Sequence, residues 1–394
     1  MSAMSDAHNT WSAAPSGGQV SLVHDYLLVM RGAERTFAAI AELYPAAPIF
    51  TLLYDEHGTN ERFAGRAITT SPLQRLNVHQ STFRRLLPLY PLAVDRLRLP
   101  PCDLVLSSSS AFAHGVRAPQ GAVHVCYCYT PFRYAWYEEA RALGENSSLL
   151  RPLLRLQLRR IRRWDLAASR KVDAYFAISE LSRKRIKRYY GRDAAIIYPP
   201  VETHRFAPGE PGDSLLVVSE VVRHKRLEVA LEAARLAHAP IRVVGSGPEH
   251  RALSEAYPEV EFLGRASDED LAKLYAEARA VIVPSMEEFG ITAVEAQAAG
   301  RPVIAAAAGG ALETVLEGQT GRLVTLDDVD AFKQAIEGID KLDFDPARAV
   351  ENAERFSVAA FQQRLAAEVA RTVERRDQGG SPLGDLSVPA TPLR

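Results

Sequence analysis

The chain has 394 residues, of which 47% are hydrophobic and 24% are charged, and its formal net charge at pH 7 is −1. This length exceeds one typical hydrophobic core and suits two globular domains. The near-zero net charge excludes a protein that binds polyanions through its overall charge.

The cysteines and the two ends of the chain exclude further classes. Cys102, Cys126 and Cys128 are too few for a disulfide scaffold, so we expect buried thiols in a reducing compartment. Residues 1–18 lack the apolar run of a signal peptide, and we expect them and residues 377–394 to be disordered tails. No stretch reaches the ~18 uncharged apolar residues that span a bilayer. We therefore expect a cytoplasmic protein.

The first half of the chain alternates short apolar runs with helical patterns, which predicts an α/β domain over residues 19–200. A helix is expected at 33–43, and Pro199-Pro200 is expected to form the hinge to the second half. The predicted strands are 19–24, 48–53, 104–106, 123–126, 174–178 and 195–198.

Polar residues follow the first predicted strand. His24 and Asp25 end it, and Arg31 and Gly32 begin the first helix. Ligands of doubly wound sheets bind at the carboxyl ends of the strands, so these four residues are candidates for an acceptor site. The alternative is that His24 and Asp25 are residues at the edge of the core.

Two further segments of this half carry candidate residues. The hydroxyls of residues 107–110, Ser110 among them, either line an acceptor site or cap a helix. The run 126–136, Cys-Tyr-Cys-Tyr-Thr-Pro-Phe-Arg-Tyr-Ala-Trp, contains Tyr129 and Arg133.

Residues 151–192 are strongly basic, with fourteen lysines and arginines against three acidic residues. Leu150, Leu154, Leu158 and Ile161 share one face of a helix in this stretch. One interpretation is contact with anionic lipid, at ~1 kcal/mol per cation near the surface. The other is a solvated helix whose leucine face packs on the first domain. We expect no nucleic-acid partner, since no recognition fold or aromatic platform accompanies the charge.

The second half predicts a doubly wound parallel sheet over residues 201–350. A helix over 351–376 is expected to end the ordered chain. The predicted strands are 215–218, 241–244, 260–263, 280–283 and 303–305.

The loops after these strands suit a phosphorylated ligand. Arg223, Lys225 and Arg226 follow the first of them and can neutralise a diphosphate. The next two loops contain glycines and a short apolar edge; their candidate binding residues are Gly245, Gly247, Phe262, Leu263, Gly264 and Arg265.

The segment Glu287-Glu288-Phe289-Gly290-Ile291-Thr292-Ala293-Val294-Glu295 is the most informative of the chain. Gly290 stands where a strand turns into a helix, whose free N–H groups and dipole favour anions. Glu287 precedes that turn and Glu295 lies about one turn inside the helix, so both can face one ligand. Alone, this spacing would also fit an ordinary αβ unit.

The pattern Glu-x-Phe-Gly-Ile-x-x-x-Glu resembles the signature of the retaining glycosyltransferases of family 4. The resemblance implies the GT-B fold: two Rossmann-like domains facing a central cleft, with the last helix crossing back to the first domain. It also implies that Glu287 contacts the donor sugar, that Glu295 binds ribose, and that Lys225 binds the diphosphate. The backbone of Phe289, Gly290 and Ile291 would meet the sugar and diphosphate.

The run 126–136 is similar to a segment of bacterial mannosyltransferases of O-antigen and exopolysaccharide assembly. Those commonly carry His where this chain has Tyr129, so the resemblance implies a catalytic contact by Tyr129 or by a histidine such as His24. The family usually has Arg where this chain has Glu220, and Arg223 or Arg226 could replace that contact.

These features predict a retaining hexosyltransferase that uses a nucleotide sugar, with GDP-mannose as the first expectation. The expected acceptor is a lipid-linked glycan, and the expected location is the cytoplasm or the inner face of the cell membrane. We expect no cofactor and no metal, so Lys225 and helix N-termini would stabilise the departing diphosphate. Two alternatives remain: a sugar-nucleotide 2-epimerase and a non-catalytic sugar-nucleotide-binding subunit.

Overall fold

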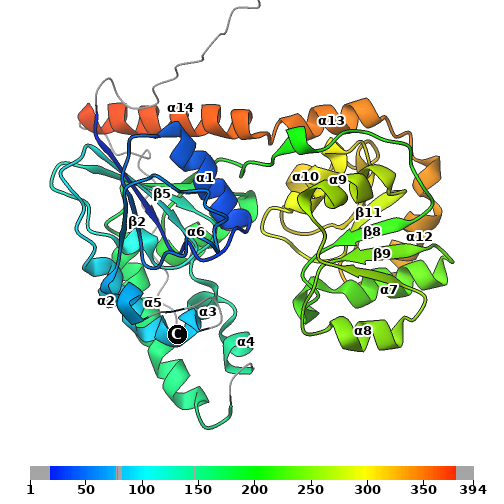
Figure 1. Ribbon diagram of the computed structural model, residues 1–394, viewed down its shortest axis with the longest axis horizontal. Coiled ribbons are helices and arrows are strands. Elements are labelled where there is room, and N and C mark those ends of the chain that lie inside the picture. The colour runs from blue at the N-terminus through cyan, green and yellow to red at the C-terminus, as the bar shows by residue number, and fades with distance from the viewer. Residues whose placement is uncertain (1–17, 77, 79–81, 145–146, 379–394) are drawn as a thin grey trace, which may run out of the picture. The chain divides into compact units, whose positions relative to one another are not determined.

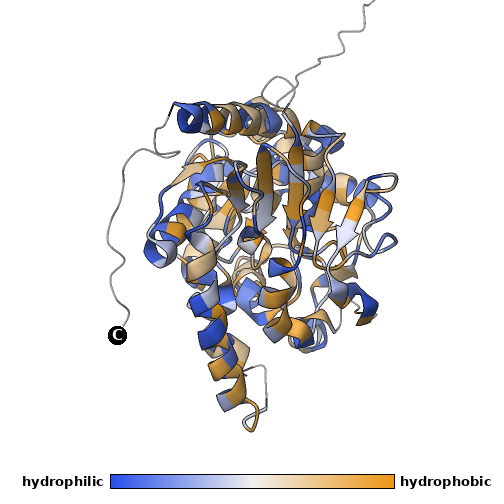
Figure 2. Cartoon of the chain, turned by 90° about the vertical axis from the view of Figure 1, so that its left-hand side faces the viewer, coloured by the Kyte–Doolittle hydropathy of each residue, from blue (hydrophilic) through white to orange (hydrophobic). Residues whose placement is uncertain are grey.

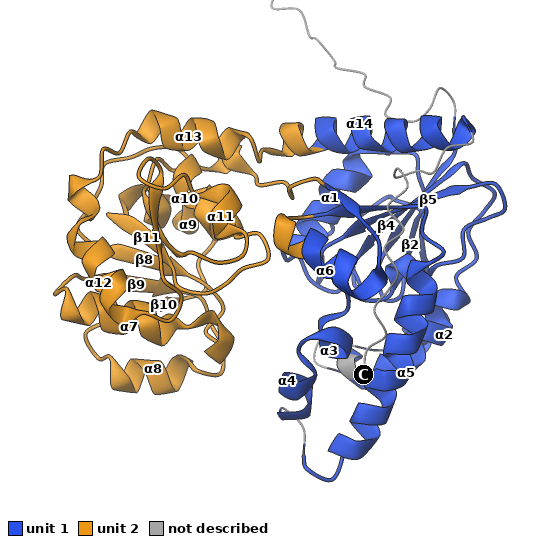
Figure 3. Cartoon of the chain, turned by 180° about the vertical axis from the view of Figure 1, so that it is seen from behind, with its two compact units in different colours: residues 1–177, 183–195, 362–394 blue, residues 178–182, 196–361 orange. Residues whose placement is uncertain are grey.

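The computed structural model describes residues 18–76, 78, 82–144 and 147–378. The predicted disordered tails, 1–18 and 377–394, lie almost entirely outside these ranges. The chain forms two compact units (Figure 3). Unit 1 holds the chain up to Ala177, residues 183–195 and the chain from Gln362 onward, and unit 2 holds residues 178–182 and 196–361.

Unit 1 is built on a seven-stranded sheet of order β3-β2-β1-β4-β5-β6-β7, and the pairings from β3 to β6 are parallel (Figure 1). Its strands are β1 (Val20–His24), β2 (Ile49–Thr51), β3 (Ile68–Thr70), β4 (Leu104–Ser109), β5 (Val123–Cys128), β6 (Ala174–Ala177) and β7 (Ala194–Ile196). The central strands are buried along their whole length, as is typical of a parallel sheet covered on both faces.

The register of the central strands decides which side chains meet at their carboxyl ends. His24 pairs with Ser108 across β1 and β4, and Ser108 pairs with Tyr127 across β4 and β5. The strands β4 and β5 each extend beyond their predicted ends, to Ser109 and Cys128. The serine run therefore belongs largely to a buried strand.

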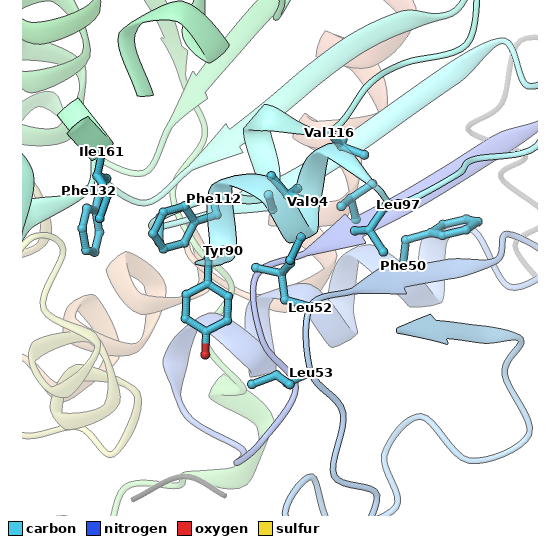
Figure 4. Packing of buried hydrophobic residues seen from close by; sticks show 14 of the residues in the cluster. Phe50, Leu52, Leu53, Tyr90, Val94, Leu97, Phe112, Val116, Phe132 and Ile161 are labelled. Atoms are coloured by element: carbon cyan, nitrogen blue, oxygen red, sulfur yellow. The ribbon is translucent and has the colours of Figure 1, made fainter. Parts of the chain in front are cut away.

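The helices of unit 1 are α1 (Gly32–Leu43), α2 (Tyr90–Asp95), α3 (Arg133–Trp136), α4 (Glu139–Gly144), α5 (Arg151–Ser169) and α6 (Glu180–Tyr190), whose first turn is counted with unit 2. Phe50 of β2, Val94 of α2 and Ile161 of α5 belong to one buried cluster (Figure 4). The aromatic rings of Tyr90 and Phe112 meet within it at 5.4 Å.

Unit 2 is a six-stranded parallel sheet of order β10-β9-β8-β11-β12-β13. Its strands are β8 (Leu215–Val218), β9 (Ile241–Val244), β10 (Glu261–Gly264), β11 (Ala280–Val283), β12 (Val303–Ala306) and β13 (Gly321–Val324). Its helices are α7 (Leu227–Leu236), α8 (His250–Ala256), α9 (Asp268–Glu277), α10 (Ile291–Ala298), α11 (Ala311–Thr314), α12 (Val329–Glu337) and α13 (Pro346–Glu354). In both units the first strand lies beside the fourth, which is the doubly wound order with its switch point between them.

The predicted helix over 351–376 is wrong in its continuity. Helix α13 ends at Glu354, and a new helix, α14 (Val358–Asp377), begins four residues later. Between them Phe356 is buried in unit 2, where its ring meets those of Tyr198 and Phe289. From Gln362 onward α14 belongs to unit 1, and the Gln362 side chain donates to the carbonyl of Ala39.

Strands β3 and β13, each at one edge of its sheet, were not predicted from the sequence. Cys126 and Cys128 are buried in β5, as expected. No described helix is long and apolar enough to cross a bilayer.

Candidate active site

Lys225 and Glu287 lie beyond the carboxyl ends of β8 and β11, the strands on either side of the switch point of unit 2. Lys225 ends a short 3-10 helix, η5 (Arg223–Lys225), that follows β8. Glu287 lies in the loop between β11 and α10. Ligands of doubly wound sheets bind at this point. The sheet order therefore brings together two residues that are 62 positions apart in the chain.

The two side chains form an ion pair. The Lys225 Nζ lies 2.8 Å from Glu287 Oε1 and 2.6 Å from Oε2. The Ser285 hydroxyl donates to Oε1 at 2.6 Å, and the Gly310 N–H donates to the Glu287 carbonyl. Both charged side chains keep about a fifth of their surface exposed, 23% for Lys225 and 21% for Glu287. The pair is held in place yet open to solvent.

Gly290 shapes the start of α10. Its φ of 91° lies in the left-handed region that favours glycine, and the helix begins at the next residue, Ile291, as predicted. The Phe289 ring is buried between Tyr198 and Phe356. The backbone of this turn is therefore what a ligand can reach, together with the N–H groups at the start of the helix, of which that of Ala293 donates to the Gly290 carbonyl.

Glu295 is held by a residue outside its own motif. The Tyr275 hydroxyl, from α9, donates to Glu295 Oε2 at 2.7 Å. Tyr275 is fully buried against Phe206, and burial, followed by the Glu295 charge, raises its pKa well above the ordinary value. The hydroxyl thus stays protonated and donates. Tyr275 was not predicted from the sequence, because a helical tyrosine twenty residues before Glu295 carries no local signal.

The two predicted arginines of the cationic loop differ in their surroundings. Arg226 pairs with Asp327, with its Nε 3.0 Å from Oδ1, and its own backbone is left-handed, with φ of 54°. Arg223 is exposed. Of the three predicted cations, Lys225 is the one that contacts Glu287.

Gly245 and Gly247 let two loops pack against each other. A Cβ on Gly245 would lie 1.8 Å from the Ser219 carbonyl oxygen, and one on Gly247 would lie 2.2 Å from that of Val221. No other residue fits such a distance. The Gly245 N–H donates to the Gly264 carbonyl at 2.6 Å, which joins this loop to the end of β10.

The candidate binding residues Phe262, Leu263 and Gly264 lie in β10 itself, and Arg265 directly follows it. The Arg265 Nε donates to the Ser246 hydroxyl at 3.1 Å, the Phe262 ring meets that of His250 at 5.2 Å, and Leu263 is 37% exposed. These residues lie one strand further from the switch point than the Gly245 loop.

In unit 1, His24 and Tyr129 meet through Ser108. The Ser108 hydroxyl lies 3.2 Å from His24 Nδ1 and 2.9 Å from the Tyr129 hydroxyl, which also donates to the Ala33 carbonyl at 2.8 Å. Both rings are buried. Burial lowers the pKa of His24 to about 4 and raises that of Tyr129 above its ordinary value. His24 is therefore neutral, and the Tyr129 hydroxyl fixes the backbone at the start of α1.

The Asp25 carboxylate is held by backbone and hydroxyl groups of the turn after β4. It accepts backbone N–H groups from Ser110, Phe112 and Ala113 at 2.6, 2.8 and 2.6 Å. The hydroxyls of Ser109 and Ser110 add two more bonds, each at 3.2 Å. With 2% of its surface exposed, Asp25 holds the turn after β4 in place.

The remaining predicted residues of unit 1 lie at helix starts. The Arg31 N–H donates to the Glu34 carboxylate at 3.1 Å, in a capping arrangement that begins α1 at Gly32. Burial raises the pKa of Glu34 to about 7. Arg133 begins α3 and is half-buried.

The site in unit 2 combines a cation, a carboxylate and a helix N-terminus, the combination that an anionic ligand with hydroxyl groups requires. Across the residues that the structure describes, no group of three or more His, Cys, Asp or Glu side chains is placed to hold a metal ion.

Both units match family models. Residues 30–205 match the family described as "Glycosyltransferase Family 4", and residues 212–339 match "Glycosyl transferases group 1". D-inositol 3-phosphate glycosyltransferase of Mycobacterium tuberculosis (strain H37Rv) is 31% identical over an alignment of 242 residues, which covers 52% of this chain and 50% of that protein. The chain thus spans about half the length of the curated relatives it matches.

Solved structures share the fold at low identity. Anabaena Alr3699/HepE in complex with UDP has a TM-score of 0.65 at 20% identity, over 89% of this chain and 99% of that one. Sucrose-phosphate synthase from Thermosynechococcus elongatus has a TM-score of 0.67 at 19% identity, over 90% of this chain and 100% of that one. The lipopolysaccharide outer core galactosyltransferase WaaB has a TM-score of 0.63 at 15% identity, over 89% and 99%. The predicted fold class, two doubly wound α/β domains of the GT-B type, is confirmed.

Proposed function

Because this chain belongs to the family 4 glycosyltransferases, we propose that it transfers a hexosyl unit from a nucleoside diphosphate sugar to a glycan acceptor. The observation that carries the proposal is the Lys225–Glu287 ion pair beyond the carboxyl ends of β8 and β11. An ammonium group suits a diphosphate, and a carboxylate beside it suits the hydroxyls of a sugar.

The same residues suggest a sequence of contacts. A diphosphate competes with Glu287 for the Lys225 ammonium, and Glu287, once released, is free to accept hydrogen bonds from the donor sugar. The N–H groups at the start of α10 provide a second place for negative charge. Glu295 accepts from the ribose hydroxyls, in the position in which Tyr275 holds it.

The transfer we propose is retaining. The bond between the anomeric carbon and the diphosphate oxygen breaks, and the acceptor oxygen bonds to that carbon on the same face. The acceptor proton passes to the departing diphosphate, which leaves as the nucleoside diphosphate. Lys225 and the α10 N-terminus stabilise the charge that develops on the leaving group, in place of a metal ion.

GDP-mannose is the first donor to test, and the support for it is the similarity of residues 126–136 to bacterial mannosyltransferases. For the acceptor we propose a lipid-linked glycan, with the basic stretch 151–192 at the inner face of an anionic membrane. The support is the charge of that stretch.

The experiment is a transfer assay in the presence of EDTA, with GDP-mannose, UDP-glucose and other sugar nucleotides offered to a lipid-linked glycan. We expect one donor to yield an α-linked product and a free nucleoside diphosphate, and we expect Glu287→Ala to abolish the product. An epimerised sugar nucleotide without transfer would favour the epimerase. Nucleotide binding without any conversion would favour the non-catalytic subunit.

A further inference from the structure

Helix α5 carries apolar side chains on two faces, and one face is packed. Leu158 and Ile161 are buried in the core of unit 1, and Leu154 packs against the same cluster. Asp165 continues this face and is fully buried, where it accepts from the Trp136 Nε1 and the Tyr190 hydroxyl. This face packs α5 onto the core of its unit.

The second apolar face lies at the N-terminal end of the helix and points to solvent. Leu149 and Leu150, just before the helix, are 89% and 54% exposed. Leu153 and Leu156, on its first two turns, are 54% and 47% exposed. Within the described ranges no large apolar side chain is more exposed than Leu149. Four exposed leucines within eight residues form a patch of a kind that water-soluble surfaces rarely carry.

Arginines follow the exposed leucines along the same face. Leu153, Leu156, Arg160 and Arg163 recur at spacings of three and four residues, which places them in one row along the helix. With a rise of 1.5 Å per residue, the first arginine of the row lies about 6 Å beyond the last leucine. In Figure 2 this helix, at the bottom of the view, shows orange and blue bands side by side.

The charge around this row is of one sign. Residues 147–170 contain seven arginines and a single acidic residue, the buried Asp165. One of these arginines, Arg162, binds within unit 1: it donates to the Ala135 carbonyl and forms an ion pair with Glu139 at 2.9 Å. Arg159, Arg160 and Arg163 are exposed. The exposed side of α5 thus combines an apolar end with a group of exposed arginines, Arg159, Arg160 and Arg163, which form an arginine collar.

We propose that this end of α5 docks into an anionic lipid bilayer. The leucines at 149, 150, 153 and 156 enter the acyl region, and the arginine collar lies at the level of the lipid headgroups, where long cationic side chains find their partners. The charge favours an anionic lipid surface over a second copy of the chain, because a second copy would bring the same excess of arginine to the contact again. The inference rests on the proposed function only for its purpose, which is to bring the enzyme to a lipid-linked acceptor.

The first test is co-sedimentation of the full chain with vesicles. Equal parts of phosphatidylglycerol and phosphatidylcholine provide the anionic surface, and phosphatidylcholine alone provides the neutral one. We expect binding to the anionic vesicles that weakens with salt. The double variant L153S/L156S should lower the partition coefficient by at least about tenfold, because two half-exposed leucines lose their apolar burial. The matched control L236S, at an exposed leucine of α7, should change nothing.

The second test separates insertion from adsorption by charge. In the variant L153W, brominated acyl chains should quench the added tryptophan, whereas in L236W they should not. Unquenched fluorescence of L153W on bound vesicles would overturn the insertion. Equal binding of L153S/L156S and the unaltered chain would overturn the proposal, as would a loss of self-association in that variant with no vesicle binding in either protein. Neither test requires catalytic turnover, so a negative result would refute membrane docking without contradicting the proposed transfer.

Discussion

Lys225 and Glu287 neutralise each other when no ligand is present, so a diphosphate that binds Lys225 must compete with the Glu287 carboxylate. The ammonium lies within hydrogen-bond distance of both carboxylate oxygens. A diphosphate must displace the carboxylate or share the ammonium with it. Glu287 therefore opposes binding of the nucleoside diphosphate and supports only a ligand that brings sugar hydroxyls as well.

Tyr275→Phe should weaken nucleotide binding through Glu295. The variant keeps the buried ring and removes the hydroxyl that donates to the Glu295 carboxylate at 2.7 Å. A hydrogen bond to a charged group contributes about 1.5–3 kcal/mol, so we expect a roughly tenfold or greater loss of affinity for GDP or UDP by titration calorimetry.

The ribose provides the control for this variant. If Tyr275 acts by positioning Glu295 on the ribose, the variant should lose affinity for the ribonucleotide and very little for its dideoxyribose analogue. Equal losses for both nucleotides would show that the hydroxyl serves only the packing of α9. Tyr257→Phe, at a half-exposed tyrosine of the same unit, should leave both affinities unchanged.

Asp25→Asn should destabilise unit 1 strongly. The carboxylate is buried and accepts three backbone N–H groups and two hydroxyls. The NH₂ group of the new asparagine would face the N–H and O–H groups that now donate to Asp25. We therefore expect the free energy of unfolding to fall by on the order of 3 kcal/mol. Urea denaturation measures this. Asp55→Asn, at an exposed carboxylate that accepts from Gly58, should cost less than about 1 kcal/mol; similar losses in both variants would contradict the role of Asp25.

At the level of the elements, the sequence predicted most strands of both units, because buried parallel strands are runs of β-branched and apolar residues. β13 was missed because Gly321-Arg322-Leu323-Val324 is only partly buried and carries a charge. The break between α13 and α14 was missed because helical periodicity continues across Phe356, and only the rings of Tyr198 and Phe289 show why the chain turns there.

In the candidate site, too, features with a local sequence signal were predictable and contacts that depend on the fold were not. The local signals at Gly290 and Ile291 predicted the start of α10. Tyr275 and Ala33 were not predictable as partners, because they meet Glu295 and Tyr129 only through the arrangement of strands and helices. Ser285 is a local partner, two residues before Glu287. Helix α5 shows the limit of periodicity. The pattern correctly placed Leu154, Leu158 and Ile161 on the face that packs, but it was wrong for Leu150, which is exposed like Leu153 and Leu156.

At the level of the whole molecule, three buried histidines of unit 1 should set the pH range of stability. Burial by itself lowers the pKa of His114, but the Asp165 carboxylate, 3.2 Å from its Nε2, outweighs this and raises the pKa to about 8. Burial lowers the pKa of His24 to about 4 and that of His124 to about 3.

These shifts predict a stability maximum near the ordinary histidine pKa of about 6.5. His114 stabilises the folded state while it is charged, so its contribution is present below that pH and is lost as the pH rises through about 8. On the acid side the unfolded chain protonates His24 and His124 while the folded chain does not, so stability falls from about pH 6.5 toward about pH 4. Each histidine contributes at most about 1.4 kcal/mol per pH unit. Urea denaturation across this range measures the curve, and His114→Gln should flatten only its alkaline side.

The measurement that tests the central claim most directly is calorimetric titration of GDP and UDP into the unaltered chain, Glu287→Gln and Lys225→Met. The claim is that the Lys225–Glu287 pair is where the diphosphate binds. We expect Glu287→Gln to bind the nucleoside diphosphate several-fold more tightly, because the competing carboxylate is gone, and Lys225→Met to bind it at least about tenfold more weakly. Glu269→Gln and Lys273→Met, which alter an exposed pair on α9, should change neither affinity. If the paired variants at 225 and 287 left the affinity unchanged, or shifted it in the same direction, the pair would not be the diphosphate site.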